Sequence, residues 1–174
     1  IRDFENGVLI LPNDKNIRLA AEQAASMINK NVAVIPSNNI PEGIAATVAF
    51  NPEASVEENR VEMTERIREI KSAEITFSVR DSKIGGLSFK KGDIIGLLGG
   101  KVAAAGESKE EVLMGVLEKM VEESDGIISV VYGADVSGAE AEDLEAQVQS
   151  RFPGKETEFL SGGQPLYYFY VSVE

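Results

Sequence analysis

The order of apolar segments near the start of the chain limits the possible folds more than any other pattern in the sequence. A short apolar run at residues 8–11 is followed by polar breakers and then by apolar side chains at helical spacing from Ile17 to Ile28. A second apolar run, residues 32–35, ends at Pro36, and an Asn- and Pro-rich loop is expected over residues 37–42. The pattern predicts strand, helix and strand, and two strands joined in this way lie parallel in a right-handed crossover.

Three capping boxes mark helix starts in the rest of the chain, because a Ser and a Glu three residues later satisfy free N–H groups reciprocally. They are Ser55/Glu58, Ser108/Glu111 and Ser137/Glu140. Strands are predicted around residues 75–79, 127–131 and 166–173, and the glycine pairs at 85–86 and 99–100 indicate hairpin turns. In the last strand, Tyr167, Phe169, Val171 and Val173 are expected to face the core, and Tyr168, Tyr170 and Ser172 the wetter side. The predicted fold class is α/β, with a small parallel α/β half (1–74) followed by a mixed-sheet α+β half (75–174).

Several function classes are excluded by composition. The chain has 17 Lys and Arg against 29 Asp and Glu residues, a formal charge of −12, and no Cys, His or Trp. Because the chain has no His and no Cys, Ser-His-Asp and Cys-His catalysis are excluded. The usual protein ligands of zinc, haem and iron–sulfur clusters are absent for the same reason. The acidic charge argues against a nucleic acid partner, and the longest apolar run, residues 44–50, is far shorter than the roughly 20 residues of a membrane span. We therefore expect no catalytic residue, metal, cofactor, nucleic acid partner or membrane span.

Two strings that superficially match catalytic motifs fail on context. Residues 88–91 read S-x-x-K, but they lie in a predicted hairpin and not at a helix start. Residues 96–101 are glycine-rich and end in Lys, but Ile95 and Val102 replace the Gly and the Ser or Thr that a phosphate-binding loop needs. Catalysis would have to come from paired carboxylates or a lysine acting alone.

The excess of negative charge is concentrated in one part of the chain. Residues 107–150 contain twelve acids and two bases. Such a field attracts a positively charged surface and raises its association rate, although an ordinary solvated surface accounts for the charge more simply. The candidate partner-binding residues are Glu107, Glu110, Glu111, Glu140, Glu142 and Asp143.

A second candidate site follows the first two strands. Asn13, Asn16 and Ser37 come after the predicted strands, and ligands of open α/β sheets bind in the crevice at that end. The crevice would suit a lipid or a phosphorylated metabolite. Helix capping by Asn13 or Asp14 is the simpler explanation of the turn.

Five segments together resemble a known bacterial family. They are LPNDKNIRLAAEQAA (11–25), IPSNNIPEGIAA (35–46), FSVRDSKIGGLSFKKGDIIGLLGG (77–100), YGADVS (132–137) and GGQPLYYFYVSVE (162–174). They resemble the C-terminal domain of the fatty acid kinase catalytic protein, which is part of a dihydroxyacetone-kinase-like (DAK2 domain) family. In that family the C-terminal domain has two DegV-like subdomains.

The resemblance implies a docking function. In that family the nucleotide-binding kinase domain and a central Cys- and His-containing domain precede this part, and the C-terminal domain binds the basic face of a DegV-type fatty acid binding protein through an acidic groove. It also implies a cytoplasmic protein, and a chain that begins with Ile1 is expected to be a fragment lacking an upstream strand and helix. DegV-type carriers bind the fatty acid carboxylate with hydroxyl groups and a histidine, whereas this chain has Ser161, Gly162 and Gly163 there and no histidine.

Overall fold

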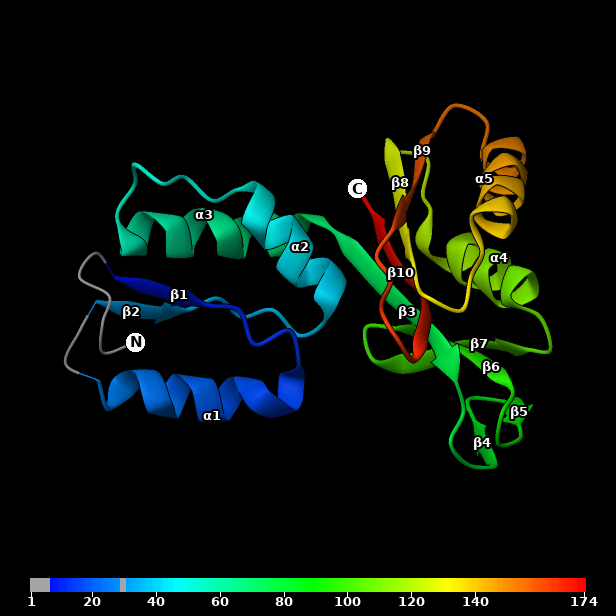
Figure 1. Cartoon of the computed structure of the whole chain (residues 1–174), viewed down its shortest axis with the longest axis horizontal. Coiled ribbons are helices and arrows are strands. Elements are labelled where there is room, and N and C mark those ends of the chain that lie inside the picture. The colour runs from blue at the N-terminus through cyan, green and yellow to red at the C-terminus, as the bar shows by residue number, and fades with distance from the viewer. Residues whose placement is uncertain (1–6, 29–30) are drawn as a thin grey trace. The chain divides into compact units, whose positions relative to one another are not determined.

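The computed structural model describes residues 7–28 and 31–174 (Figure 1). The chain divides into two compact units, Ile1–Ile70 and Lys71–Glu174. The expected boundary after residue 74 falls inside strand β3 (Lys71–Phe77), which begins directly after Ile70. One parallel and one mixed sheet confirm the predicted α/β class. Within the described ranges, no helix combines the length and apolar composition that a bilayer crossing requires.

The first unit is built on two parallel strands, β1 (Val8–Ile10) and β2 (Val32–Val34), connected by helix α1 (Lys15–Ser26). Helices α2 (Ile40–Val48) and α3 (Val56–Glu69) follow. The capping box at α3 is complete, because Ser55 and Glu58 each accept the other's backbone N–H. The buried core of the unit is small and consists of Ile35, Ala46 and Met63, with Leu9, Leu11, Ala49 and Ile67 packed against it.

Helix α2 corrects the loop predicted over residues 37–42, because residues 40–42 form its first turn. Asn39 caps the helix by accepting the N–H of Glu42 at 2.9 Å. Pro41 fits the first turn, where a backbone N–H has no partner within the helix. Pro and Gly so close together favour a loop by local propensity, and burial of Pro41, Gly43 and Ala46 outweighs that preference.

The second unit contains a six-stranded sheet in the order β7-β6-β3-β10-β8-β9 (Figure 1). Its other strands are β6 (Ile94–Leu98), β7 (Lys101–Gly106), β8 (Ile127–Tyr132), β9 (Glu156–Ser161) and β10 (Tyr167–Val173). Pairing is antiparallel except between β8 and β9, which lie parallel and are joined through helix α5 (Gly138–Arg151). Helix α4 (Lys109–Met120) connects β7 to β8. A separate hairpin of β4 (Ser82–Ile84) and β5 (Leu87–Phe89) precedes β6.

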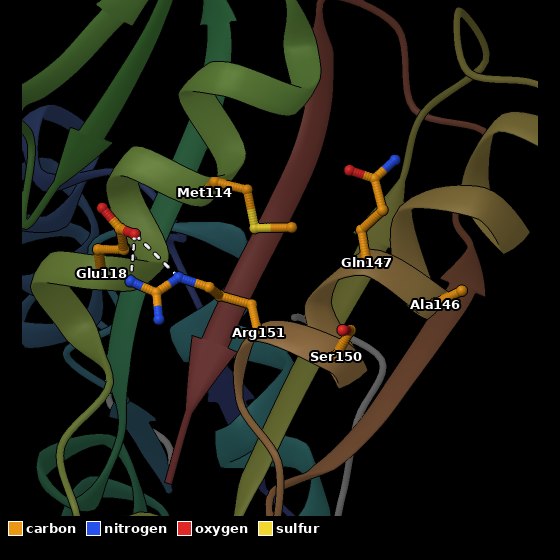
Figure 2. A pocket seen from close by; sticks show the side chains of 6 residues that line it. All are labelled: Met114, Glu118, Ala146, Gln147, Ser150 and Arg151. Carbon is orange, nitrogen blue, oxygen red and sulfur yellow. Dashed lines mark hydrogen bonds and ion pairs between the residues drawn. The ribbon is translucent and has the colours of Figure 1, made fainter.

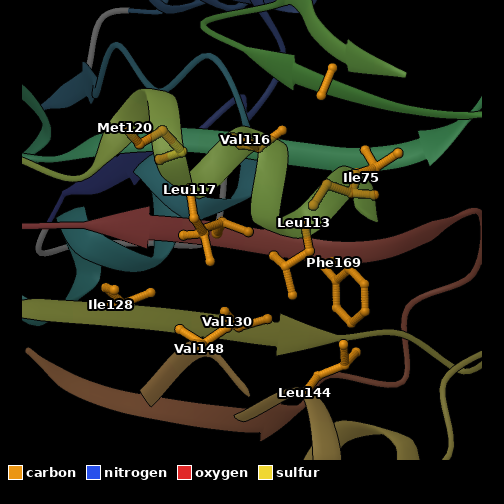
Figure 3. Close-up of a cluster of buried hydrophobic side chains, with 14 of the residues drawn as sticks. Ile75, Leu113, Val116, Leu117, Met120, Ile128, Val130, Leu144, Val148 and Phe169 are labelled. Atoms are coloured by element: carbon orange, nitrogen blue, oxygen red, sulfur yellow. The ribbon is translucent and has the colours of Figure 1, made fainter. Parts of the chain in front are cut away.

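Helices α4 and α5 cover the same face of this sheet and bury the main core with it (Figure 3). The predicted apolar stripe of α4 is confirmed, since Val112, Leu113, Val116, Leu117 and Met120 are all buried. They pack with side chains of the central strands and of α5, including Ile75, Ile128, Val130, Leu144, Val148 and Phe169.

A bulge in β10 changes the expected alternation of its tyrosines. Tyr167 pairs with Thr76 and Phe169 with Ile75, so Tyr168 is an extra residue on β10. Tyr168 therefore packs against the core, whereas Tyr167 shares a face with Tyr170, with ring centroids 5.0 Å apart. The faces assigned to Tyr167 and Tyr168 from strict alternation were wrong. Tyr170 lies opposite Phe169 as predicted, but it is buried and not on a wetter surface. The assignment of Phe169, Val171 and Val173 to the core is confirmed.

Both predicted glycine hairpins are confirmed. Gly85 and Gly86 have φ of 57° and 87° between β4 and β5, and Gly99 and Gly100 have φ of 55° and 75° between β6 and β7. Positive φ at both central positions is the geometry that matches the twist of the flanking strands.

Candidate functional site: the α4–α5 surface

Ion pairs join helices α4 and α5 at both ends. At their first turns, Lys109 Nζ lies 2.9 Å from Glu140 Oε1 and donates to the Asp135 carbonyl oxygen at 2.7 Å. At their last turns, Arg151 donates to Glu118 Oε1 from Nη2 at 2.7 Å and from Nε at 3.1 Å. Because the first turns of the two helices contact each other and so do their last turns, the helices run side by side in the same direction.

An open groove of about 600 Å³ lies between the two helices (Figure 2). It is lined by Met114 and Glu118 from α4 and by Ala146, Gln147, Ser150 and Arg151 from α5. Met114 and Ala146 provide apolar surface, and the Glu118–Arg151 ion pair borders the groove on the side of Met114 (Figure 2). We call these six residues the α4–α5 groove.

Acidic side chains lie one helical turn before the residues that line the groove. Glu110 precedes Met114 by four residues, and Glu142 and Asp143 precede Ala146 and Gln147 in the same way, so each pair shares a helix face. We use the name acidic surface for four exposed residues, Glu107, Glu110, Glu142 and Asp143. Asp143 Oδ2 accepts a hydrogen bond from Gln147 Nε2 at 2.9 Å. Among the described residues, none of these four carboxylates forms an ion pair.

The other two predicted partner-binding residues have partners within the domain. Glu111 Oε2 accepts the backbone N–H of Glu107 at 3.2 Å, and Glu140 is bound by Lys109. Ser108 and Ser137 cap their helices, so the predicted helix starts are confirmed. Five of the six predicted carboxylates are therefore exposed and without a cation from the described part of the chain, and among these five Glu111 is set apart because it accepts the Glu107 N–H.

The second candidate site is only partly assembled. The Asn13 N–H donates to Ser37 Oγ at 3.1 Å, and Ser37 is fully buried where β1 and β2 end. Asn13 has φ of 54°, and its Oδ1 is buried with no hydrogen bond among the described residues. Asn16 lies on the exposed first turn of α1, where its N–H donates to the Asp14 carboxylate at 2.7 Å. The capping explanation of this turn is confirmed for Asp14.

A partly buried ionic cluster was not foreseen from sequence. Lys71 Nζ lies 2.8 Å from Asp125 Oδ2 and 3.1 Å from Glu122 Oε2, and it also donates to the Met120 carbonyl oxygen. Burial raises the pKa of Asp125, but hydrogen bonds from Lys71 and from the Glu122 N–H outweigh burial and bring it below the ordinary value. Lys71 and Asp125 are 54 positions apart, and no local pattern connects them. Within residues 7–28 and 31–174, no three acidic, His or Cys side chains are grouped as metal ligands.

Comparison with known proteins identifies the family. The sequence matches the FakA-like C-terminal family of fatty acid kinase over residues 4–174. It is 42% identical to Protein YloV of Bacillus subtilis over 167 residues, which are 96% of this chain and 30% of YloV. It is 38% identical over 166 residues to an uncharacterized protein of Staphylococcus haemolyticus, covering 95% of this chain and 30% of that protein. The chain thus spans less than a third of the length of these relatives.

Solved structures with the same fold are much more distant in sequence. The DegV family protein Cg2579 of Corynebacterium glutamicum has a TM-score of 0.65 at 18% identity, covering 97% of this chain and 75% of that one. A fatty-acid-binding DegV family protein of Thermus thermophilus has a TM-score of 0.59 at 16% identity, covering 98% and 72%. The dihydroxyacetone kinase of C. freundii has a TM-score of 0.52 at 15% identity, covering 98% and 38%. The chain has a DegV-like fold and belongs to the FakA-like C-terminal family of fatty acid kinase domains.

Proposed function

We propose that this chain is a non-catalytic docking domain of a fatty acid kinase, which binds a basic, DegV-type fatty-acid-carrying protein through the acidic surface of α4 and α5. Family membership supplies the kinase context, and DegV-like neighbours include proteins whose names state lipid or fatty acid binding. The observation that carries the proposal is the set of exposed carboxylates beside the α4–α5 groove, which have no cation from the described part of the chain.

The contribution of such a surface would be positioning and not bond-making. The ion pairs at both ends fix α4 and α5 relative to each other, so the carboxylates are held in place before a partner arrives. Preorganised charges lower the cost of ordering side chains on binding and steer the encounter with a cationic face. The domain would thereby bring the acyl carboxylate of the carried fatty acid to a kinase site elsewhere in the longer protein.

Titration of the carrier protein against the domain at several salt concentrations tests the electrostatic part. Affinity should fall steeply with ionic strength, because exposed charges are screened within about 10 Å at 0.1 M salt. The triple variant Glu110→Lys, Glu142→Lys, Asp143→Lys should weaken binding at least about tenfold and reduce the salt dependence.

A matched control separates a local surface from total charge. Glu53, Glu62 and Glu65 are exposed acids of the first unit, and reversing all three to Lys changes the net charge by the same amount. This control should change affinity by less than about threefold. Equal losses in both triple variants, or an affinity that does not depend on salt, would rule out the proposed surface.

The alternative is a domain that binds a small ligand near Asn13, Asn16 and Ser37. The buried Asn13 Oδ1 favours it, because an acceptor without a partner is costly inside a protein. Against a phosphorylated ligand, the adjacent turn already holds the Glu42 carboxylate, which accepts hydrogen bonds from Asn38 and Asn39. Native mass spectrometry of the purified domain discriminates, since a retained lipid or metabolite supports this alternative and its absence at saturating added ligand excludes it.

A further inference from the structure

The β4–β5 hairpin carries a group of cations in an otherwise acidic chain. Arg80, Lys83, Lys90 and Lys91 lie in or beside the hairpin, and all four are exposed. None of them forms an ion pair with a residue in the described part of the chain. Elsewhere many cations do have carboxylate partners, such as Arg18, Arg60, Lys109 and Arg151. The charge of this hairpin therefore faces solvent.

The two nearby carboxylates bind backbone groups at the base of the hairpin. Asp81 Oδ1 accepts the N–H of Lys91 at 2.8 Å, and Asp93 Oδ2 accepts the N–H of Lys90 at 2.7 Å. These hydrogen bonds fix the loop that brings the lysines to the surface. The side-chain ammonium groups remain available for a partner with negative charge.

The hairpin is also anchored to the sheet. Ser78 N–H donates to the Asp93 carbonyl oxygen at 2.8 Å, and Gly92 N–H donates to the Ser78 carbonyl oxygen at 2.7 Å. Phe89 is buried at the end of β5. Figure 1 shows the hairpin projecting beyond β6 and β7, at the opposite end of the second unit from α5. The cations thus sit on an ordered projection away from the acidic end of α5.

Aliphatic side chains accompany the cations. Ile84, next to the Gly85–Gly86 turn, is 45% exposed, and Val79, at the base, is 73% exposed. Ile84 pairs across the hairpin with Leu87, which is half-buried. The tip is therefore apolar, with Lys83 beside it on β4 and with Arg80, Lys90 and Lys91 at the base of the hairpin.

We propose that the β4–β5 hairpin binds the surface of an anionic lipid bilayer, with Ile84 at the interface and the four cations against lipid phosphates. Lys and Arg near an anionic membrane are attracted to it, and a strand rises about 3.3 Å per residue, which places Lys90 roughly 10 Å from Leu87 along the hairpin. An acidic protein would match the cations but gives no role to the exposed aliphatic tip. This proposal does not depend on the docking function of α4 and α5.

Co-sedimentation with vesicles tests the proposal. The 174-residue domain should bind vesicles of equimolar phosphatidylglycerol and phosphatidylcholine at least about tenfold more strongly than vesicles of phosphatidylcholine alone, and high salt should remove the difference. Because this comparison uses the unaltered protein, it does not depend on the folding of a variant. Absence of binding to the anionic vesicles overturns the proposal.

Variants then locate the contact. Lys83→Gln, Lys90→Gln, Lys91→Gln together should reduce binding at least about tenfold, and Ile84→Ser should reduce it by a smaller factor at high salt as well as low. The matched control Lys15→Gln, Arg68→Gln, Lys101→Gln removes three other exposed cations and should change binding less than about twofold. Equal losses in both triple variants overturn the assignment, as does a hairpin that binds an acidic protein but no anionic vesicle.

Discussion

Lys109 and Glu140 connect the first turns of α4 and α5 across 31 residues of sequence, with Nζ 2.9 Å and 3.2 Å from the two carboxylate oxygens. The same Nζ lies 5.2 Å from the centroid of the Tyr168 ring. The ammonium group therefore links both helices to the bulged end of β10, and it neutralises one acid in a region where most acids face solvent.

Replacing Lys109 by Met should lower the free energy of unfolding by about 1–2 kcal/mol. The change removes the ion pair and the hydrogen bond to the Asp135 carbonyl oxygen, and it leaves the Glu140 carboxylate without its cation. Urea unfolding followed by circular dichroism measures the effect. Lys101→Met is the control, because Lys101 is exposed and forms no ion pair in the described ranges; comparable losses in both variants would contradict this role of Lys109.

The stability of the domain should depend on acid pH through Asp125. Its pKa in the folded protein lies below the ordinary value of 3.8, so the unfolded chain binds the proton more readily. The stabilisation by Asp125 is therefore complete above pH 3.8 and disappears as pH falls through the folded-state pKa. Asp125→Asn should lose about 1–3 kcal/mol at neutral pH, and the difference from wild type should shrink as pH decreases below 3.8.

The control for this experiment is Glu123→Gln, two residues away and exposed. Urea unfolding midpoints measured from neutral to acid pH should be nearly the same for this variant and the wild type. A constant difference between Asp125→Asn and wild type at every pH would show that the Lys71–Asp125 ion pair is not the source of the stabilisation.

The elements that were predictable from sequence are those with strong local signals. The apolar stripe of α4 begins behind a Ser cap, and the glycine pairs at 85–86 and 99–100 allow positive φ that other residues resist. Helix α2 was missed because Pro41 and Gly43, which lie in its first turns, are residues typical of loops. Strand β9 was missed because it is an edge strand with a mostly exposed surface, in which only Thr157 and Phe159 are half-buried.

Long-range relationships were not predictable from local patterns. The bulge at Tyr168 depends on the pairing of β10 with β3, and pairing register is not visible in one strand alone. The acidic segment was apparent from charge counts, but which acids remain without a cation depends on contacts such as Lys109 with Glu140 and Arg151 with Glu118. Sequence thus located the candidate region and the structure selected residues within it.

A double-mutant cycle should reveal the close contact between Gly43 and Asn13. A Cβ added at Gly43 would lie 2.1 Å from Asn13 Oδ1, so Gly43→Ala should destabilise the domain by about 1–2 kcal/mol despite the better helix propensity of Ala. Asn13→Gly removes the obstructing side chain and suits the φ of 54°. In that background Gly43→Ala should be neutral or stabilising by up to about 1 kcal/mol, as measured by urea unfolding. Additive effects of the two changes would contradict the contact.

Alkaline titration should distinguish Tyr170 from the other tyrosines. Burial raises the pKa of its hydroxyl to about 12, and the neighbouring Tyr167 and Glu74 add to the effect. The folded protein therefore keeps a proton that the unfolded chain releases near the ordinary pKa of 10, so this contribution to stability is constant below pH 10 and decreases as pH rises toward 12.

Tyr170→Phe should abolish the latest phase of phenolate absorbance, followed at about 295 nm, and make stability less dependent on pH above 10. Tyr132→Phe is the control, because it removes one tyrosine of the same strand pair and should leave that late phase in place. Buried Tyr170 lies on the face opposite Phe169, so its replacement by Phe keeps most of the packing and isolates the hydroxyl. Persistence of the late phase in Tyr170→Phe would mean that another tyrosine carries the raised pKa.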